Sequence, residues 1–288
     1  MTTPLAPSLR SWLADGRPAA RITVIGARGS TPREAGATMI VTTEALSGTI
    51  GGGRLEWEAV AAARDFLHGE RASMVVELPL GPAIGQCCGG HVTLMIERAD
   101  QRMLAAIEAA EHDAREATPR IIIFGAGHVG RALARALGLL PMRIRWIDER
   151  AGEFGPSAWP ENIEVVVTAN WAAEVAQAPA GAACIVLTHS HALDSLITAA
   201  ALERGDFAYV GLIGSLTKRR RFERAFREIG LSRAQIAPLV CPIGDVGVRD
   251  KRPEIIAALV AAELIQVFAR NAFARVAQTT PSLRGEAA

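Results

Sequence analysis

The sequence predicts an α/β protein with a doubly wound, Rossmann-like parallel sheet in its C-terminal half and a smaller α+β domain before it. Strand-like and helix-like segments alternate from Arg120 onward, which is typical of a parallel sheet covered by helices on both faces. A G-x-G-x-x-G turn, Gly125–Gly130, follows the first of these strands and leads into a helical stretch. The region before it has short strand-like stretches separated by glycine-rich loops, which indicates a separate unit.

The expected domain boundaries follow these changes in pattern. We expect an N-terminal domain over residues 1–100, a connecting helix over 101–118, the Rossmann-like domain over 119–276 and a flexible tail over 277–288. In the first domain, apolar residues at helical spacing predict a helix over Leu55–Leu67. Its strands are expected at Ala20–Ala27, Met39–Thr42, Met74–Leu78 and His91–Glu97.

The second domain is expected to contain apolar strands that are buried on both faces. A last helix should begin near Pro253, because proline suits the first turn of a helix, and run toward Val276. The strands are expected at Arg120–Phe124, Ile144–Ile147, Ile163–Val167, Ala183–Leu187 and Tyr209–Ile213.

Composition narrows the classes of function. With 31 Lys plus Arg against 30 Asp plus Glu, the net charge of +1 argues against a nucleic-acid or membrane-surface binder. No apolar run has the length of a membrane span, and the first residues lack the pattern of a signal peptide. Four cysteines in 288 residues do not indicate a disulfide scaffold. We therefore expect a cytoplasmic protein with free thiols and neither nucleic acid nor membrane as a partner.

The glycine turn predicts a ligand that carries a phosphate. Gly125 allows the tight turn, Gly127 lets a phosphate approach the backbone, and Gly130 lets helix and strand pack closely. The helix start at His128 favours an anion. Asp148 closes the next strand, where an acid usually bonds a ribose hydroxyl. The alternative is a doubly wound domain whose loop has lost its ligand.

Further candidates follow other strands, where ligands gather in doubly wound sheets. They are His189 and His191 after the fourth strand, Gly214 and Ser215 after the fifth, and Cys241 before the last helix. The spacing of these histidines and this cysteine matches no standard zinc pattern, so whether a metal binds stays open.

Two charged features next to these candidates have two interpretations each. Asp194 either belongs to the histidine segment or caps the following helix. The run Lys218-Arg219-Arg220-Arg221 is either a solvated helix face or a holder of an anionic group.

The N-terminal domain adds a glycine loop and a pair of thiols. Gly51, Gly52 and Gly53 precede a helix, so they form either a second anion cradle or a tight turn. Cys87 and Cys88 stand between glycines, and adjacent cysteines rarely cross-link with each other. They are either thiols presented to a ligand or small packed residues. Cys184 lies within an apolar strand and is expected in the core.

Together these segments resemble the XdhC/CoxI family of accessory proteins for molybdenum hydroxylases, over about residues 8 to 268. The most specific matches are Gly85-Gln86-Cys87-Cys88-Gly89-Gly90 and Thr188-His189-Ser190-His191-Ala192-Leu193-Asp194. The resemblance implies a chaperone, not a turnover enzyme. Such proteins bind the molybdenum cofactor, a molybdopterin, hold it while a cysteine desulfurase supplies its sulfido ligand, and pass it to an apo-hydroxylase such as xanthine dehydrogenase. A homodimer is also implied.

The chemistry of the loops is compatible with this resemblance. Molybdopterin ends in a phosphate, which the glycine turns are expected to hold. The thiols of Cys87, Cys88 or Cys241 are expected to face the metal or relay sulfur. The runner-up is an NAD(P)-dependent oxidoreductase that uses the glycine turn, Asp148 and a histidine proton donor. A scaffold without a ligand, and a chaperone that also binds a nucleotide at the Rossmann turn, are further alternatives.

Overall fold

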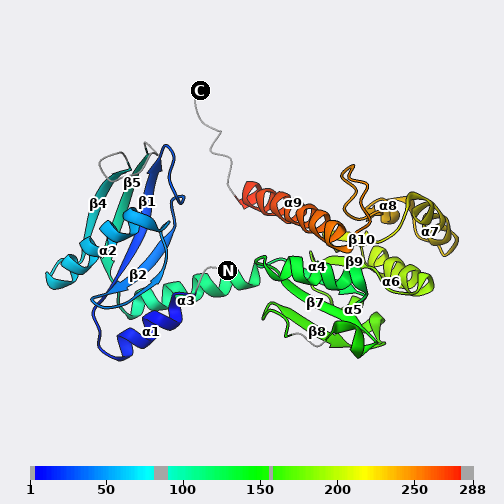
Figure 1. Cartoon of the computed structure of the whole chain (residues 1–288), viewed down its shortest axis with the longest axis horizontal. Helices are drawn as coiled ribbons and strands as arrows, with labels where there is room; N and C mark the ends of the chain where they lie inside the picture. The colour runs from blue at the N-terminus through cyan, green and yellow to red at the C-terminus, as the bar shows by residue number, and fades with distance from the viewer. Residues whose placement is uncertain (1–3, 81–89, 156–157, 280–288) are drawn as a thin grey trace, which may run out of the picture. The chain divides into compact units, whose positions relative to one another are not determined.

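The structure is a computed structural model that describes residues 4–80, 90–155 and 158–279, with side chains through Asn271. The chain divides into two compact units, Met1–Ala117 and Thr118–Ala288 (Figure 1). Among the described residues, every helix is too short or too polar to cross a membrane. The predicted fold class is confirmed: an antiparallel sheet with helices precedes a parallel, Rossmann-like sheet.

The first unit is built on a five-stranded antiparallel sheet with the order β3-β2-β1-β5-β4. Helix α2 (Gly53–His68) covers one face of this sheet through Leu55, Ala59 and Phe66. Helices α1 (Ala6–Ala14) and α3 (Gln101–Glu116) share a second cluster on the other face. The strands are β1 (Ala19–Arg28), β2 (Thr38–Thr42), β3 (Leu46–Gly48), β4 (Ser73–Leu80) and β5 (Gly90–Arg98).

The residues of β2 show how both faces become buried. Met39 and Val41 join the cluster under α2, whereas Ile40 between them joins the cluster of α1 and α3. Leu104 and Ile107 of α3 are buried in that second cluster. The helix expected as a connector therefore packs as part of the first unit.

The second unit is a six-stranded parallel sheet with the order β11-β10-β9-β6-β7-β8. Helices α4 (His128–Gly138) and α9 (Pro253–Thr279) pack on one face against Ile121 and Ile123. The opposite face, with Ile122 and Phe124, is covered by α5–α8. The strands are β6 (Arg120–Phe124), β7 (Arg143–Asp148), β8 (Ile163–Val167), β9 (Ala183–Val186), β10 (Tyr209–Leu212) and β11 (Leu239–Val240). The covering helices are α5 (Trp171–Gln177), α6 (His191–Arg204), α7 (Leu216–Glu228) and α8 (Arg233–Ile236).

This strand order has a switch point between β6 and β9. From β6 the chain proceeds outward through β7 to β8, and then returns to the other side of β6 for β9, β10 and β11. Ligands of doubly wound sheets bind outside the carboxyl ends of the strands at such a point. One prediction was wrong in detail: β8 is an edge strand, and its Val165 and Val167 are exposed instead of buried on both faces.

Candidate functional site

The glycine turn at the end of β6 contains two glycines that the fold itself requires. Gly125 has φ +118°, and a side chain there would overlap the backbone oxygen of Leu187. A side chain at Gly130 would overlap the backbone oxygen of Gly125. Both positions are therefore explained by packing of the turn against itself and against the end of β9.

Gly127 is different, because packing does not require it. Among the described residues, no atom lies within 4 Å of the place where its Cβ would stand, and its φ of −66° is open to any residue. Gly127 is also the N-cap of α4, and no side chain in the described structure caps that helix. Its first N–H groups are thus left for an external acceptor, next to a space that a methyl group would fill.

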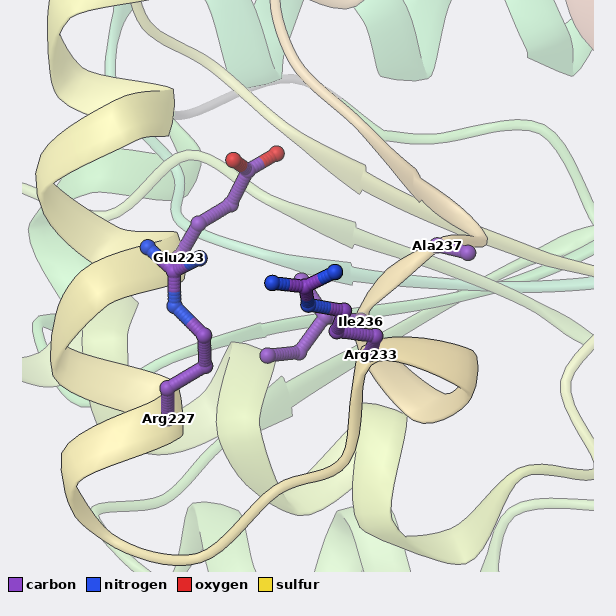
Figure 2. Close-up of a pocket in the computed structure, with 5 residues that line it drawn as sticks. All are labelled: Glu223, Arg227, Arg233, Ile236 and Ala237. Atoms are coloured by element: carbon purple, nitrogen blue, oxygen red, sulfur yellow. The ribbon is translucent and has the colours of Figure 1, made fainter.

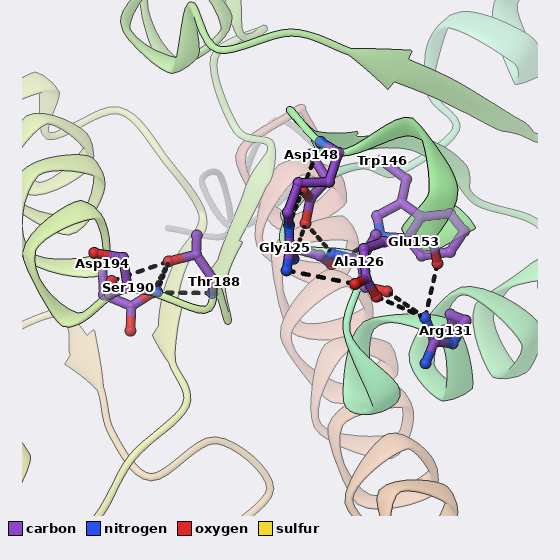
Figure 3. A network of polar contacts seen from close by, with 10 residues as sticks. Gly125, Ala126, Arg131, Trp146, Asp148, Glu153, Thr188, Ser190 and Asp194 are labelled. Carbon is purple, nitrogen blue, oxygen red and sulfur yellow. Dashed lines mark hydrogen bonds and ion pairs between the residues drawn. The ribbon is translucent and has the colours of Figure 1, made fainter. Parts of the chain in front are cut away.

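Asp148, at the end of β7, contacts the glycine turn directly (Figure 3). Its Oδ2 accepts from the Ala126 N–H at 2.7 Å and from Arg150 Nη2 at 2.8 Å. Its Oδ1 accepts from the Arg150 N–H at 3.0 Å and from Arg150 Nε at 2.9 Å. Burial raises the pKa of Asp148, but the hydrogen bonds from Arg150 and Ala126 outweigh burial, so the pKa lies below its ordinary value.

A chain of ion pairs extends this contact to α4. Glu153, in the short helix η2 (Ala151–Phe154), lies 3.5 Å from Arg150 Nη1 and 3.0 Å from Arg131 Nη1. Arg131 also donates to the Ala126 oxygen at 3.0 Å, and its Nη2 lies 3.1 Å from His128 Nδ1. Figure 3 shows Arg131 and Glu153 beside the turn. The turn is therefore fixed from both the strand side and the helix side.

The histidine segment after β9 folds around Asp194. Ser190 is the N-cap of α6 and accepts from the Leu193 N–H. Asp194 instead accepts from the Thr188 N–H at 2.9 Å and from Thr188 Oγ1 at 2.8 Å. The interpretation of Asp194 as the helix cap was wrong, because its side chain turns back to the strand end.

Asp194 also pairs with a largely buried lysine. The Lys218 Nζ lies 2.7 Å from Asp194 Oδ2 and donates to the Ile213 oxygen at 2.9 Å. Exposure of the two side chains is 11% for Lys218 and 2% for Asp194. Lys218 therefore joins the ends of β9 and β10, and it is not part of a solvated run as its sequence neighbours suggested.

The two histidines lie at the surface of this segment. Both residues are exposed, and the Nδ1 of His191 is 4.0 Å from Asp194 Oδ2. In the part of the chain that the structure describes, no three His, Cys, Asp or Glu side chains group as metal ligands. The roles of His189 and His191 stay predictions.

Cys241, after β11, lies beside Gly214 and Ser215. A Cβ at Gly214 would stand 3.2 Å from Cys241 Sγ, and the thiol lies 3.9 Å from the Ser215 oxygen. Ser215 itself caps α7. Burial raises the pKa of the Cys241 thiol, and the nearby charges of Lys218 and Arg219 only partly offset this. The thiol is thus protonated at neutral pH, which disfavours it as a nucleophile.

The glycine loop before α2 already contains a carboxylate. Glu56 Oε2 accepts from Thr49 Oγ1 at 2.6 Å, and from the N–H groups of Ile50 and Gly52 at 3.2 Å each. The Gly51 N–H is bonded to Thr49 Oγ1. Of the N–H groups that were expected to await a ligand, that of Gly52 is therefore taken by the Glu56 carboxylate and that of Gly51 by the Thr49 hydroxyl. Cys87 and Cys88 lie outside the described residues.

A hollow of about 170 Å³ lies between α7 and α8 (Figure 2). It is lined by Glu223, Arg227, Arg233, Ile236 and Ala237. Its α7 residues come two turns or more after the helix start at Ser215. None of the predicted site residues lines it, so it is separate from the site at the strand ends.

The sequence did not predict the roles of Arg150 and Lys218. The signal for Arg150 was its place two residues after Asp148, from which an arginine can fold back onto the acid. Lys218 had no such signal, because only the fold brings it to Asp194. Lys218 differs from Arg220 and Arg221 because its ammonium pairs with Asp194 below the surface, whereas those two arginines are exposed.

Comparisons with known proteins agree with this architecture. The XdhC Rossmann domain matches residues 121–264, and the XdhC and CoxI family matches residues 12–78. The uncharacterized protein YqeB of Escherichia coli (strain K12) is 28% identical over 263 residues, covering 87% of this chain and 43% of YqeB. The chain thus spans less than half of that relative's length.

A solved structure supports the fold over the whole length. The crystal structure of a protein described as a xanthine dehydrogenase from Bacillus halodurans superposes with a TM-score of 0.76. It is 18% identical, and the match covers 98% of each chain. The matched domains, and the Rossmann strand order that carries the glycine turn, lead to one conclusion: this chain belongs to the XdhC and CoxI family.

Proposed function

We propose that this chain is an accessory protein that binds molybdopterin, keeps it for sulfuration by a cysteine desulfurase, and delivers it to an apo molybdenum hydroxylase. Membership of the XdhC and CoxI family is consistent with an accessory role in the maturation of such hydroxylases. The observation that carries the proposal is the open space at Gly127, beside the uncapped start of α4.

The glycine turn fits the phosphate end of molybdopterin. The N–H groups of His128 and its neighbours at the start of α4 favour an anion, and Gly127 leaves room for its oxygens. Gly125 and Gly130 keep the turn in the shape that brings these groups together. When bound, the cofactor supplies the molybdenum centre that receives the sulfido ligand.

The remaining candidates have unequal support. Thr188, Asp194 and Lys218 form a rigid edge at the next strands, near which His189, His191, Gly214 and Ser215 lie. Cys87 and Cys88 remain the thiols proposed to face the metal. Cys241 has less support in that role because its thiol is buried and protonated. The Gly51–Gly53 loop has less support as an anion site because the Glu56 carboxylate already accepts from the Gly52 N–H.

In this proposal the chain holds and transfers a cofactor and does not itself turn over a substrate. Xanthine dehydrogenase is the first client to test, with a cysteine desulfurase as the sulfur donor and a second copy of this chain as the expected partner in a homodimer. A cytoplasmic location belongs to the same proposal.

Retention of the cofactor tests the proposal directly. Protein and molybdopterin are mixed without oxygen and passed through gel filtration, and the bound pterin is quantified by the fluorescence of its oxidised form. We expect stoichiometric retention by the natural chain and loss of it in Gly127→Ala. Gly69→Ala is the matched control, because Gly69 has φ −92° and its nearest atom would lie 3.7 Å from the added methyl group.

Three results would count against parts of the proposal. Absence of retention by the natural chain would remove the cofactor-binding role. Equal retention by Gly127→Ala would show that the phosphate binds somewhere other than the glycine turn. Retention by a variant with Cys87 and Cys88 both changed to alanine, with sulfuration and transfer intact, would remove the proposed role of those thiols.

A further inference from the structure

Asp148 stands where an acid normally binds ribose in this fold, but both of its carboxylate oxygens are already fully used as hydrogen-bond acceptors. An ionised carboxylate offers about four lone-pair positions on its two oxygens. Asp148 uses them on Ala126 N–H and on three groups of Arg150, namely N–H, Nε and Nη2. Ribose hydroxyls would need to donate to the same oxygens.

Arg150 is held in place over this carboxylate. Its side chain is 35% exposed, whereas that of Asp148 is only 4% exposed, so Arg150 lies on the solvent side of the pair. Its third nitrogen, Nη1, lies 3.5 Å from Glu153, which is itself tied to Arg131 at 3.0 Å. A ligand that displaced Arg150 would thus break a connected set of charge-assisted contacts, which are among the stronger ones in proteins.

The phosphate part of the same site is unaffected by this arrangement. The space at Gly127 and the uncapped start of α4 belong to the turn, whereas the side chain of Arg150 bonds to Asp148 and pairs with Glu153. One site therefore combines an open phosphate position with a closed ribose position.

We infer that the glycine turn accepts a terminal phosphate monoester and rejects the adenosine ribose of nicotinamide dinucleotides, and that Arg150 is the residue that sets this selectivity. This inference rests in part on the proposed function, because molybdopterin carries such a phosphate. It also explains how a chain with a dinucleotide-type turn can avoid occupation by abundant dinucleotides.

The chain contains a matched control for Arg150. Arg252 makes the same contacts to an acid two residues earlier, with its N–H, Nε and Nη2 on Asp250. That pair lies on an exposed loop before α9, and its arginine side chain is 72% exposed. Arg252→Ala therefore removes the same charge and the same local pair without touching the turn.

Calorimetric titration of the full chain with NAD⁺ and NADP⁺ tests the inference. We expect Arg150→Ala to bind NAD⁺ at least about tenfold more tightly than the natural chain, because hydrogen bonds to a charged acceptor become available. Arg252→Ala should leave NAD⁺ binding unchanged. The gain should disappear when Asp148→Asn is added to Arg150→Ala. Arg150→Gln serves as a second neutral variant if the alanine variant unfolds.

Three results would overturn the inference. They are micromolar NAD⁺ binding by the natural chain, no gain in folded Arg150→Ala and Arg150→Gln, or tight NADP⁺ binding that these variants lose. The last would make Arg150 an anchor for a ribose phosphate. Molybdopterin retention separates the two proposals: if the natural chain fails to retain it while the NAD⁺ gain is observed, only the proposed function fails.

Discussion

Lys218 and Asp194 form a nearly buried ion pair, 2.7 Å between Nζ and Oδ2, that joins α7 to the start of α6. The same carboxylate also accepts from Thr188 at the end of β9, and the same ammonium donates to Ile213 at the end of β10. The ends of β9 and β10 are therefore fixed to each other by one charge pair.

Removing one partner of this pair should be costly. Lys218→Ala leaves the Asp194 carboxylate buried without its cation, and we expect a loss of about 3–5 kcal/mol in the free energy of unfolding. Urea denaturation followed by circular dichroism measures it. Arg224→Ala on the same helix is the control: its pair with Glu228 is exposed, 79% and 63%, and should contribute less than about 1 kcal/mol. Equal effects of the two substitutions would refute the structural role of Lys218.

Substitutions at the glycine turn should separate fold from ligand binding. We expect Gly125→Ala to lose at least about 1–3 kcal/mol, because φ is +118° and the methyl group meets the Leu187 backbone. Gly127→Ala should stay within about 0.5 kcal/mol of the natural chain. Urea midpoints of both variants provide the comparison, and a strongly destabilised Gly127→Ala would show that its position is also needed for packing.

The contribution of Asp148 to the free energy of unfolding should depend on pH. Its pKa in the folded state lies below the ordinary 3.8, so the contribution is present above that value and is lost as the pH falls through the lower, folded pKa. The stability difference between the natural chain and Asp148→Asn should therefore be constant from pH 5 to 7 and shrink below about pH 4. A difference that grows on acidification would contradict the assignment.

Thiol reactivity gives a further test. Burial raises the pKa of Cys184 to about 12 and raises that of Cys241 as well. In a variant with Cys87 and Cys88 changed to alanine, we expect both remaining thiols to react slowly with Ellman's reagent at pH 7 and quickly in urea. Rapid reaction of Cys241 in the folded protein would restore it as a candidate for sulfur chemistry.

Much of the fold could be predicted from the sequence because apolar strands carry a strong local signal. β6 and β8 were predicted with the bounds that the structure shows, and the glycine turn was placed between β6 and α4. β3 and β11 have only three and two residues, too few for a periodic pattern. Helix α1 was missed because it begins between two prolines, of which Pro7 lies in its first turn.

The site was harder to predict because side-chain pairing decides it. Glu56 looked like an ordinary helical residue, yet it returns to the loop before its own helix. Lys218 stands beside three arginines in the sequence, and only its burial against Asp194 separates it from them. Arg150 was passed over because Asp148 was interpreted as an acid that bonds a ribose hydroxyl, and only the structure shows that the arginine folds back onto it.

The three glycines of the turn also differ in what they record about the history of the chain. A lineage that abandoned the ligand would still need Gly125 and Gly130, because the backbone there has no room for a side chain. Gly127 could then be replaced by other residues, since a methyl group there meets nothing in the described structure. Among relatives, the residue at this one position should therefore distinguish proteins that still carry a phosphate ligand from those that have kept only its architecture.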